Sequence, residues 1–433
     1  MKEITKVVVD AMGGDNAPHE IIKGAVEAVG KSDAIHVILV GKEDVINQEL
    51  SGYTYNKEQI SVVHTSEVIE TAEPPVMAIR RKKDSSIVVG LKMVKDKEAD
   101  AFVSAGSSGA VLAGGQLLVG RIKGVERPPL APLIPTEKGF SILIDCGANV
   151  DARPSHLVQF AKMGSIYMEH IMGVKNPKVA IVNIGAEEEK GNALVKETFP
   201  MLKECKDINF IGSIEAREIP HGQADVIVCE AFTGNVILKL YEGVASVLVS
   251  KIKGGMKQNL RGMIGGLLVK PVLKKTMKDF DASEYGGAPL LGLTGLVVKT
   301  HGSSKAKEVC NSILQCVTFK EEGINEKIKE CIQAEEKSAP EAEKAAAAKD
   351  TSAAETIELK CAADLQDAVL SYLGAGAKIV KVKSSGVVIK AKTIVNEDFY
   401  AQLIEWGGVK LSEPSERRKE FKKYCKKIIS QYK

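Results

Sequence analysis

Short, continuously apolar segments alternate with longer amphipathic segments over much of the chain. The apolar runs occupy residues 7–9, 37–40, 101–103, 142–144, 179–182, 226–228 and 296–298. After the first run, Ile21, Ile22, Ala25, Val26 and Val29 recur at the spacing of one helix face. Strands buried on both faces of a parallel sheet have such continuous apolar runs, and helices connect them. The pattern predicts an α/β fold with a parallel-rich central sheet flanked by helices.

Most of the apolar runs end in a cluster of glycine and small polar residues. The clusters read DAMGGDNAPHE (10–20), SAGSSGA (104–110), DCGANVD (145–151), NIGAEEEKGN (183–192) and CEAFTGN (229–235). Turns from strand to helix favour such residues for geometric reasons, so one cluster alone has a structural explanation. Ligands of parallel sheets bind beyond the carboxyl ends of the strands, and several clusters on one rim predict a long polar cleft. No P-loop occurs and no GxGxxG follows the first run, so nucleotide binding is unsupported.

Composition narrows the class of protein. The chain has 433 residues, 44% of them hydrophobic, which is enough for more than one domain. Its 59 basic and 56 acidic residues nearly balance. The net charge therefore gives no reason to expect a nucleic acid partner. The eight cysteines form no CxxC or CxxH pattern, so we expect no zinc site and reduced thiols in the cytoplasm. We also expect no membrane-spanning helix, because no uncharged apolar run has the required length.

Two residues near the predicted rim can carry charge or protons. Lys190 follows three acidic residues and precedes a glycine turn, where a lysine can meet a phosphate or a developing oxyanion. His301 lies in KTHGSS, directly after the run 296–298, and is the best placed histidine for proton transfer. The alternatives are that Lys190 is an ordinary solvated lysine and that His301 has only a structural role in its loop.

An ordered set of segments resembles one family. The segments include VVDAMGGDNAPHEIIKGA, SAGSSGA, VGRIKGVERPPLAP, DCGANVDARPSHLVQFAKMGSIY, NIGAEEEKGN, FIGSIEAREI, EAFTGNVILKLYEG and YGGAPLLGLTGLVVKTHGSS. From about Lys6 to residue 333 they resemble PlsX, the bacterial phosphate acyltransferase family. The resemblance implies transfer of a long acyl chain from acyl carrier protein to inorganic phosphate, giving acyl phosphate for phospholipid synthesis. It also implies a homodimer at the membrane surface, no metal or organic cofactor, and a fold similar to isocitrate and isopropylmalate dehydrogenases and to phosphotransacetylase.

The resemblance also assigns site residues. Lys190 matches the lysine of the family's KGN motif, and Asn235 matches the asparagine of its FTGN motif. We take Lys190, Asn235, Asp10 and His301 as the catalytic candidates, with Asp10 orienting the first loop. The candidates for substrate binding are Gly13, Gly14, Asp15, Ser107, Ser108, Asn149, Asn192 and Gly234. Phosphate can attack the thioester directly, so Cys146 and Cys229 are expected to pack as small apolar residues.

The segment from about 235 to 279 mixes apolar and basic residues at a predicted helix–helix turn. Leu260, Met263, Ile264 and Leu268 lie among lysines and Arg261. Such a segment suits a dimer core, an anionic membrane surface or an acidic carrier protein. The resemblance favours dimer contact for the stem and membrane contact for the turn.

The resemblance ends near residue 333 and divides the chain. We assign 1–333 to the catalytic domain and 334–355, rich in Ala, Glu and Lys, to a low-complexity linker. Residues 356–433 are predicted to form a small α+β domain of unknown role. It would contain a strand at 357–359, a helix around Leu365 to Leu373, a hairpin of 379–382 with 387–389, and a basic final helix from 415.

Two other functions remain open at the level of sequence. One is a short-chain acyl-phosphate-forming enzyme that uses a cysteine, similar to a glycine reductase component, for which Cys361 is the candidate. The other is a non-catalytic membrane scaffold for lipid synthesis. A third interpretation of the same fold is a dehydrogenase, although the sequence resembles the acyltransferases.

Overall fold

The computed structural model describes most of the chain in two compact units. Described are residues 4–279, 282–338 and, within 355–431, all but 363–364, 367–368, 370–372, 374–376, 384–385, 394, 396–398, 401–402 and 405–408. The units are Met1–Glu336 and Lys337–Lys433. Most of the predicted linker, residues 339–354, lies outside the described residues.

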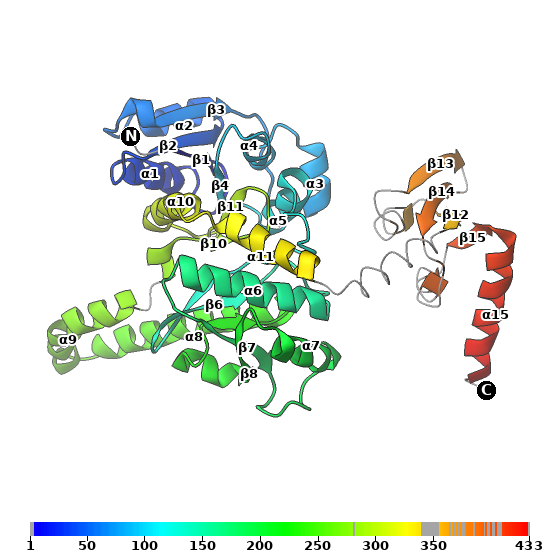
Figure 1. Ribbon diagram of the computed structural model, residues 1–433. Helices are drawn as coiled ribbons and strands as arrows, with labels where there is room; N and C mark the ends of the chain where they lie inside the picture. Colours follow the sequence, from blue (N-terminus) through cyan, green and yellow to red (C-terminus); the bar gives the residue numbers. More distant parts are fainter. Residues whose placement is uncertain are drawn as a thin grey trace. The chain divides into compact units, whose positions relative to one another are not determined.

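The first unit contains a six-stranded sheet in the order β10-β11-β4-β1-β2-β3 (Figure 1). Its strands are β1 (Thr5–Asp10), β2 (Ile35–Gly41), β3 (Ile60–His64), β4 (Ala101–Ser104), β10 (Ala288–Pro289) and β11 (Leu296–Lys299). All neighbours are parallel except β10, which pairs antiparallel at the edge. The strands of the N-terminal half therefore share this sheet with a strand from the end of the unit.

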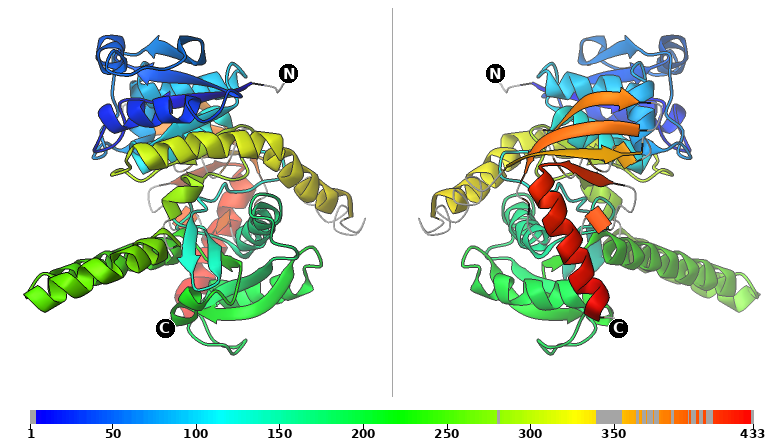
Figure 2. Two further views of the ribbon diagram at one scale, coloured as in Figure 1. Left: turned by 90° about the vertical axis from the view of Figure 1, so that its left-hand side faces the viewer. Right: turned by 90° about the vertical axis from the view of Figure 1, so that its right-hand side faces the viewer.

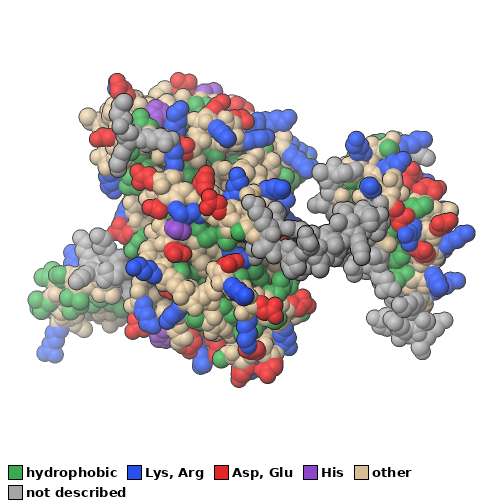
Figure 3. Space-filling view, in the orientation of Figure 1, with side chains coloured by type: hydrophobic (Ala, Val, Ile, Leu, Met, Phe, Trp, Pro, Cys, Tyr) green, Lys and Arg blue, Asp and Glu red, His purple; other side chains and the backbone are tan. Residues whose placement is uncertain are grey.

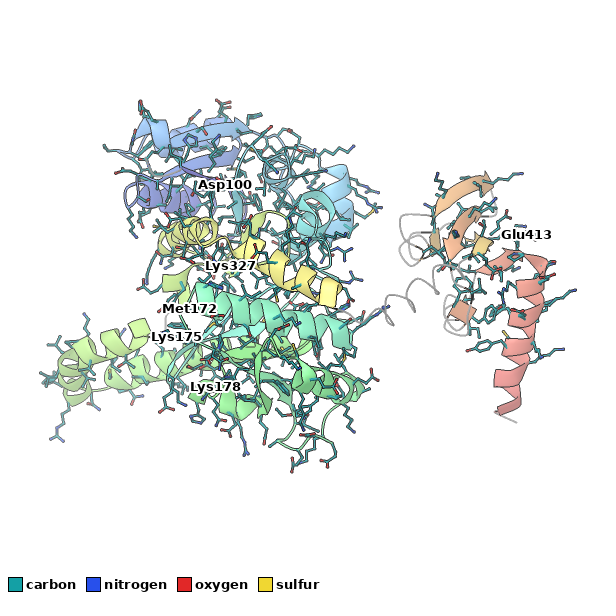
Figure 4. The ribbon with its side chains drawn as sticks, viewed as in Figure 1. Asp100, Met172, Lys175, Lys178, Lys327 and Glu413 are labelled. Atoms are coloured by element: carbon teal, nitrogen blue, oxygen red, sulfur yellow. The ribbon has the colours of Figure 1, made fainter. Side chains whose placement is uncertain are left out.

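A second, five-stranded sheet has the order β5-β6-β9-β7-β8. Its strands are β5 (Leu133–Thr136), β6 (Gly139–Ile144), β7 (Lys178–Asn183), β8 (Asn209–Glu215) and β9 (Val226–Val228). Only the β5–β6 pair is antiparallel. Lys178, at the start of β7, and Asp100, just before β4, mark the two sheets in Figure 4.

The α/β class with parallel-rich sheets is confirmed, and every apolar run of the sequence is part of a strand. The strands nevertheless form two sheets, not the one central sheet that we expected. The reason is that a continuous apolar run shows burial on both faces of a strand. It carries no information about which strand lies beside it.

Helices cover both faces of the first sheet. On one face pack α1 (His19–Val29) and α10 (Ala306–Glu321). The other face is covered by α3 (Pro75–Arg81), α4 (Ser86–Lys95) and α5 (Ser108–Gly114). The short helix α2 (Glu43–Leu50) follows β2.

One hydrophobic core joins the two sheets. It includes α6 (Pro154–His170) and α7 (Ala193–Glu204), which pack on the second sheet, together with α10 and α11 (Ile324–Ser338). Tyr167 of α6 meets Phe319 of α10 edge to face, with ring centroids 5.7 Å apart. This packing of α6 on α10 couples the sheets within the unit, as the central position of these helices in Figure 1 shows.

Helices α8 (Ala231–Met256) and α9 (Leu260–Asp279) form a hairpin that projects from the sheets in all views (Figures 1 and 2). The turn between them, residues 257–259, lies where the sequence predicted a helix–helix turn. Large apolar side chains are exposed along the hairpin, and they form the green patch on its surface in Figure 3. In α8 only Ala231 and Gly234 are buried.

Helix α8 bears on the expectation that the chain has no membrane-spanning helix. By length and composition it could cross a membrane, with a mean hydropathy of 1.3 in its best window, and it is the one such helix in the described part of the chain. Helix α8 contains no uncharged apolar run of the required length, because Lys239 and Glu242 interrupt its apolar residues. Their side chains pair with each other at 2.8 Å. A single helix of this kind is weak evidence for a membrane span.

The second unit contains an antiparallel sheet in the order β13-β14-β12-β15. Its strands are β12 (Glu355–Cys361), β13 (Lys378–Lys383), β14 (Gly386–Thr393) and β15 (Lys410–Glu413), and helix α15 spans Ser415–Gln431. The predicted first strand, hairpin and final helix are confirmed, whereas β15 was not predicted. The predicted helix around 365–373 lies partly outside the described residues, as does the hairpin turn at 384–385.

Gly234 lies where the fold leaves no room for a side chain. A Cβ atom there would lie 1.9 Å from the carbonyl oxygen of Asp145, whereas one at Gly243 of the same helix would meet nothing within 4 Å. Gly234→Ala should therefore destabilise the protein by about 1–3 kcal/mol or more, the usual scale of overpacking. Gly243→Ala should be neutral or stabilising by up to about 1 kcal/mol. Denaturant unfolding of both variants checks this, and equal stabilities would contradict the close packing at Gly234.

Candidate functional site

A cavity of about 470 Å³ is bordered by residues from both sheets of the first unit. The first sheet contributes residues after β4, at β10 and after β11, and the second contributes residues around β5, after β6 and from the start of α8. Its lining consists of Ser108, Leu112, Leu130, Pro132, Leu133, Cys146, Gly147, Val150, Ala231, Phe232, Asn235, Leu238, Lys239, Glu242, Tyr285, Gly286, Gly287, Ala288, Lys299, Thr300, His301, Gly302 and Glu308. Its size is typical of small-molecule sites, about 300–1,000 Å³.

The polar end of the cavity contains a buried lysine. Lys299, the last residue of β11, is 6% exposed. Burial lowers its pKa to about 8, although the nearby carboxylates of Asp10 and Glu308 oppose this shift. Its ammonium group donates to the carbonyl oxygen of Thr300. The hydroxyl of Thr300 is also buried and has no hydrogen-bond partner among the described residues.

His301 and Lys239 place two donors side by side. The backbone N–H of Ser303 donates to His301 Nδ1 at 3.2 Å, so the proton of a neutral ring lies on Nε2. His301 Nε2 lies 3.4 Å from Lys239 Nζ, which donates to Glu242 at 2.8 Å. Two donors this close favour a shared acceptor between them. With Lys299 and Thr300, they form a place suited to an anion.

Six large apolar side chains also line the cavity. They are Leu112, Leu130, Leu133, Val150, Phe232 and Leu238, and we call them the apolar wall. Cys146 lines the cavity as well, and burial raises the pKa of its thiol well above the usual value. Cys229, buried beside it, is shifted in the same direction for the same reason. Neither cysteine is therefore a thiolate nucleophile near neutral pH, as expected for cysteines that pack as apolar residues.

Asp145 organises the loop after β6. Its fully buried carboxylate accepts hydrogen bonds from the backbone N–H groups of Leu130, Gly147, Ala148 and Asn149, and from the Asn149 side chain. Burial raises the pKa of Asp145, and these hydrogen bonds oppose the shift. The Asn149 amide also donates to the carbonyl oxygen of Pro128 at 3.0 Å. Asn149 thus holds the loop beneath the cavity and does not line the cavity itself.

Asp10 has a comparable position at the end of β1. Its carboxylate accepts from Ser104 Oγ at 2.7 Å, and burial raises its pKa. A Cβ atom at Gly13 would lie 2.2 Å from Asp10 Oδ2, so the loop can pass this carboxylate only with glycine there. Gly14 has a φ of +106°, which favours glycine, and the backbone N–H of Asp15 donates to Gly302 O at 2.7 Å. The first loop therefore supports the His301 loop from beneath.

The structure brings three of the predicted residues together. Asn235, His301 and Ser108 line the cavity. Ser107 caps α5 instead, Asn192 caps α7, and Gly234 packs against Asp145. The structure shows the contacts that these three residues make within the protein. Their roles in substrate binding stay predictions.

Lys190 lies apart from the cavity lining. It is in the loop between β7 and α7, where its ammonium group pairs with Glu187 at 2.8 Å and its side chain is 48% exposed. The Glu187 carboxylate raises the pKa of Lys190, which therefore stays charged. Its assignment as a catalytic residue stays a prediction from the motif.

Three cavity residues were missed in the sequence: Lys239, Lys299 and Thr300. Lys299 ends the apolar run 296–298, and a lysine at the end of a buried strand could have pointed to it. Lys239 gave no such signal, because it looks like a solvated residue of an amphipathic helix. Among the described residues, no group of three or more His, Cys, Asp or Glu is placed to hold a metal ion.

The fold is that of an α/β protein of the phosphotransacetylase type. The structure of a phosphotransacetylase from Streptococcus pyogenes matches with a TM-score of 0.50, covering 73% of this chain and 94% of that one at 15% identity. At such low identity this match shows the fold alone. It agrees with the likeness to phosphotransacetylase expected from the sequence.

The sequence comparisons identify the family. Residues 5–327 match the family described as "Fatty acid synthesis protein". The phosphate acyltransferase of Clostridium novyi (strain NT) is 54% identical over 328 residues, covering 76% of this chain and 98% of that protein. The phosphate acyltransferase of Alkaliphilus oremlandii (strain OhILAs) is 55% identical over 327 residues, covering 76% and 97%. The chain therefore belongs to the phosphate acyltransferase family PlsX, and it is an acyltransferase.

The lowered pKa of Lys299 predicts a pH dependence for the binding of an anion such as phosphate in this cavity. Because the folded pKa of about 8 lies below the usual value, Lys299 is charged below pH 8 and becomes neutral above it. The KM calculated for the phosphate dianion should therefore be flat below about pH 8 and rise above it.

Initial rates from pH 7 to 10 with wild type and Lys299→Met check this. The variant should have a higher KM that no longer changes across this range. A rise above pH 8 that persists in the variant would exclude Lys299 as its source.

Proposed function

We propose that this chain transfers a long-chain fatty acyl group from acyl carrier protein to inorganic phosphate at the cavity described above. The products are acyl phosphate, which supplies phospholipid synthesis, and the free carrier thiol. The observation that carries the proposal is the pairing of an apolar wall with an end of clustered donors in one cavity. An acyl chain fits the first, and phosphate fits the second.

The reaction needs no covalent enzyme intermediate. A phosphate oxygen attacks the thioester carbonyl, the C=O electrons move to oxygen, and a tetrahedral oxyanion forms. When this collapses, the C–S bond breaks and the carrier leaves as its thiolate. The protein has to hold the dianion close to the carbonyl and stabilise the oxyanion.

The donors at the polar end are suited to the first task. Lys299, Lys239 and His301 Nε2–H supply donors, and Glu242 and Glu308, the acidic residues of the lining, balance the charges of the two lysines. Phosphate would give the Thr300 hydroxyl a partner, which it lacks among the described residues, and would give the other donors a further acceptor. The second task falls to Asn235, whose side-chain amide can donate to the oxyanion from the first turns of α8.

Lys190 and Asn235 can be tested against controls on neighbouring elements. Losing one oxyanion or phosphate contact costs about 10²-fold in turnover. We expect Asn235→Ala to lower kcat by about that factor, and Lys190→Ala to lower kcat or raise the phosphate KM similarly. Lys203 pairs with Glu188 at 2.8 Å in the same acidic region, so Lys203→Ala is the control and should leave kinetics unchanged. Normal kinetics in folded Lys190→Ala would exclude that assignment and leave phosphate to the cavity lysines.

We also propose that the α8–α9 hairpin carries a cytoplasmic homodimer to the membrane surface. The exposed apolar residues of α9 include Leu260, Met263, Ile264 and Leu268, which are between 54% and 74% exposed. The segment 243–278 has eight Lys and Arg and no Asp or Glu. Apolar side chains with surrounding cations suit shallow insertion into an anionic bilayer.

The stem of the hairpin is the proposed dimer contact. Val236, Leu240, Val244, Val247, Leu248 and Ile252 are exposed on α8. They recur at helical spacing and form one apolar stripe, which α9 leaves uncovered. A second copy of the chain would bury such a stripe.

Two matched triple variants separate these contacts. Replacing Leu260, Ile264 and Leu268 with Ser should weaken binding to anionic vesicles at least about tenfold, because three inserted side chains are lost. Turnover of soluble substrate should be largely unchanged. Replacing Val244, Val247 and Leu248 with Ser should instead shift the mass measured by light scattering toward the monomer. A monomeric first variant with normal vesicle binding would place those residues in the dimer interface.

The cysteine-dependent alternative finds no support at Cys361. This residue is 5% exposed, within the hydrophobic core of the second unit. The experiment that tests the proposal is incubation of the purified chain with palmitoyl carrier protein and phosphate. Phosphate-dependent release of carrier thiol, unchanged in Cys361→Ala, is the expected result. No release with palmitoyl carrier protein would contradict the proposed substrate.

A further inference from the structure

The second unit has a sheet face that its own structure does not explain. On one side of the sheet, Ile357, Leu359, Val387, Ile389 and Leu411 form the hydrophobic core. The intervening residues point to the other side, since side chains alternate along strands. Six of the residues on that side are exposed lysines: Lys360, Lys378, Lys381, Lys390, Lys392 and Lys410. We call this surface the lysine face.

The strand register places these lysines next to one another. Lys378 of β13 is directly opposite Lys390 of β14, and Lys360 of β12 is directly opposite Lys410 of β15. Neighbouring strands are about 4.8 Å apart, so each pair brings two ammonium groups close together. None of the six forms an ion pair with a described residue. Like charges directly opposite each other destabilise a sheet. Glu358 lies opposite Lys390 on its other side and offsets this for one pair, whereas Lys360 has Val388 there, so folding of the unit does not account for the Lys360–Lys410 pair.

The charge of the chain is concentrated in this unit. Residues 355–433 carry 15 Lys and Arg against 10 Asp and Glu, whereas residues 1–336 carry 41 against 43. The curated relatives match to 97–98% of their own length over about 327 residues. The unit is therefore an addition to a complete catalytic part, and its cations are not needed for the shared reaction.

We infer that the lysine face is a docking surface for the acyl carrier protein. This inference rests on the proposed function, in which an acidic carrier protein delivers the acyl group. Charge complementarity selects an acidic partner, and the unit is covalently joined to the catalytic part. A carrier held there is present at an effective concentration on the order of millimolar, so even a weak contact would raise its occupancy of the cavity.

The composition of the face favours a protein over a lipid surface or a nucleic acid. Its central apolar side chain, Val388, is 7% exposed and is not available to enter a bilayer. Among the described residues of the face, none is aromatic and able to stack on bases. Glu358 of β12 lies directly opposite both Lys390 of β14 and Glu413 of β15, so one row across the face runs from cationic to acidic. This polarity would orient a protein partner; Glu413 is labelled in Figure 4.

The test compares two full-length variants with the same loss of charge. The face variant carries Lys360→Gln, Lys378→Gln, Lys390→Gln and Lys410→Gln. The helix variant carries Lys419→Gln, Lys422→Gln, Lys423→Gln and Lys426→Gln on α15, which packs on the core side through Phe421 and Tyr424. Removing two like-charge pairs should leave the face variant at least as stable as wild type.

Kinetics and binding are then measured at about 50 mM and about 500 mM salt. The face variant should raise the KM for palmitoyl carrier protein about tenfold at low salt and weaken binding of acyl-free carrier protein by the same factor. Its kcat and phosphate KM should be unchanged, high salt should abolish the difference, and the helix variant should behave as wild type.

Several results would overturn the inference. These are an unchanged KM in the face variant, an equal effect in the helix variant, or loss of binding to anionic vesicles or RNA with carrier binding intact. The acyl-free carrier separates this inference from the proposed function. If the carrier binds to the lysine face but no thiol is released in the presence of phosphate, the docking surface is supported and the proposed reaction is refuted. If thiol is released but binding does not depend on the lysine face, the reaction is supported and the docking surface is refuted.

Discussion

The geometry of the site depends on the buried carboxylate of Asp145. A carboxylate without solvent must be satisfied by donors, and here four backbone N–H groups and one side-chain amide supply them. These bonds tie the approach to β5 and the loop after β6 to one point. Gly234 packs directly on the carbonyl group of the same residue. The start of α8, and with it Asn235 and Lys239, is positioned by this contact.

The cavity itself is a consequence of how the two sheets are joined. Because α6 and α10 share one core, the end of β11 in the first sheet borders the same cavity as the loops after β6 and β9 in the second. The first sheet supplies the buried lysine and the histidine, and the second supplies most of the apolar wall. Neither sheet alone contains both parts of a site for phosphate and an acyl chain.

The near-neutral composition of the chain conceals a strong separation of charge. The catalytic unit is close to balance, its hairpin is cationic without any acidic residue from 243 to 278, and the second unit carries an excess of cations. Opposite charges within a domain mostly pair locally. The cationic segment 243–278 of the hairpin and the lysine face are therefore better guides to external partners than the net charge of the chain.

The class of fold, the seven buried strands with continuous apolar runs, and the family could all be predicted from the sequence. Burial on both faces of a parallel strand requires a continuous apolar run, and this requirement is local. The sequence also placed the polar clusters at the strand ends, including His301 and Asn235. It could not decide which cluster residues face a ligand, because Asn149 and Ser107 have equally good uses as loop and helix caps.

Only the tertiary structure decided that the strands form two sheets. It also showed that Lys190 pairs with Glu187 while Lys299 is buried in the cavity. These outcomes depend on distances between residues far apart in the chain, which no local pattern records.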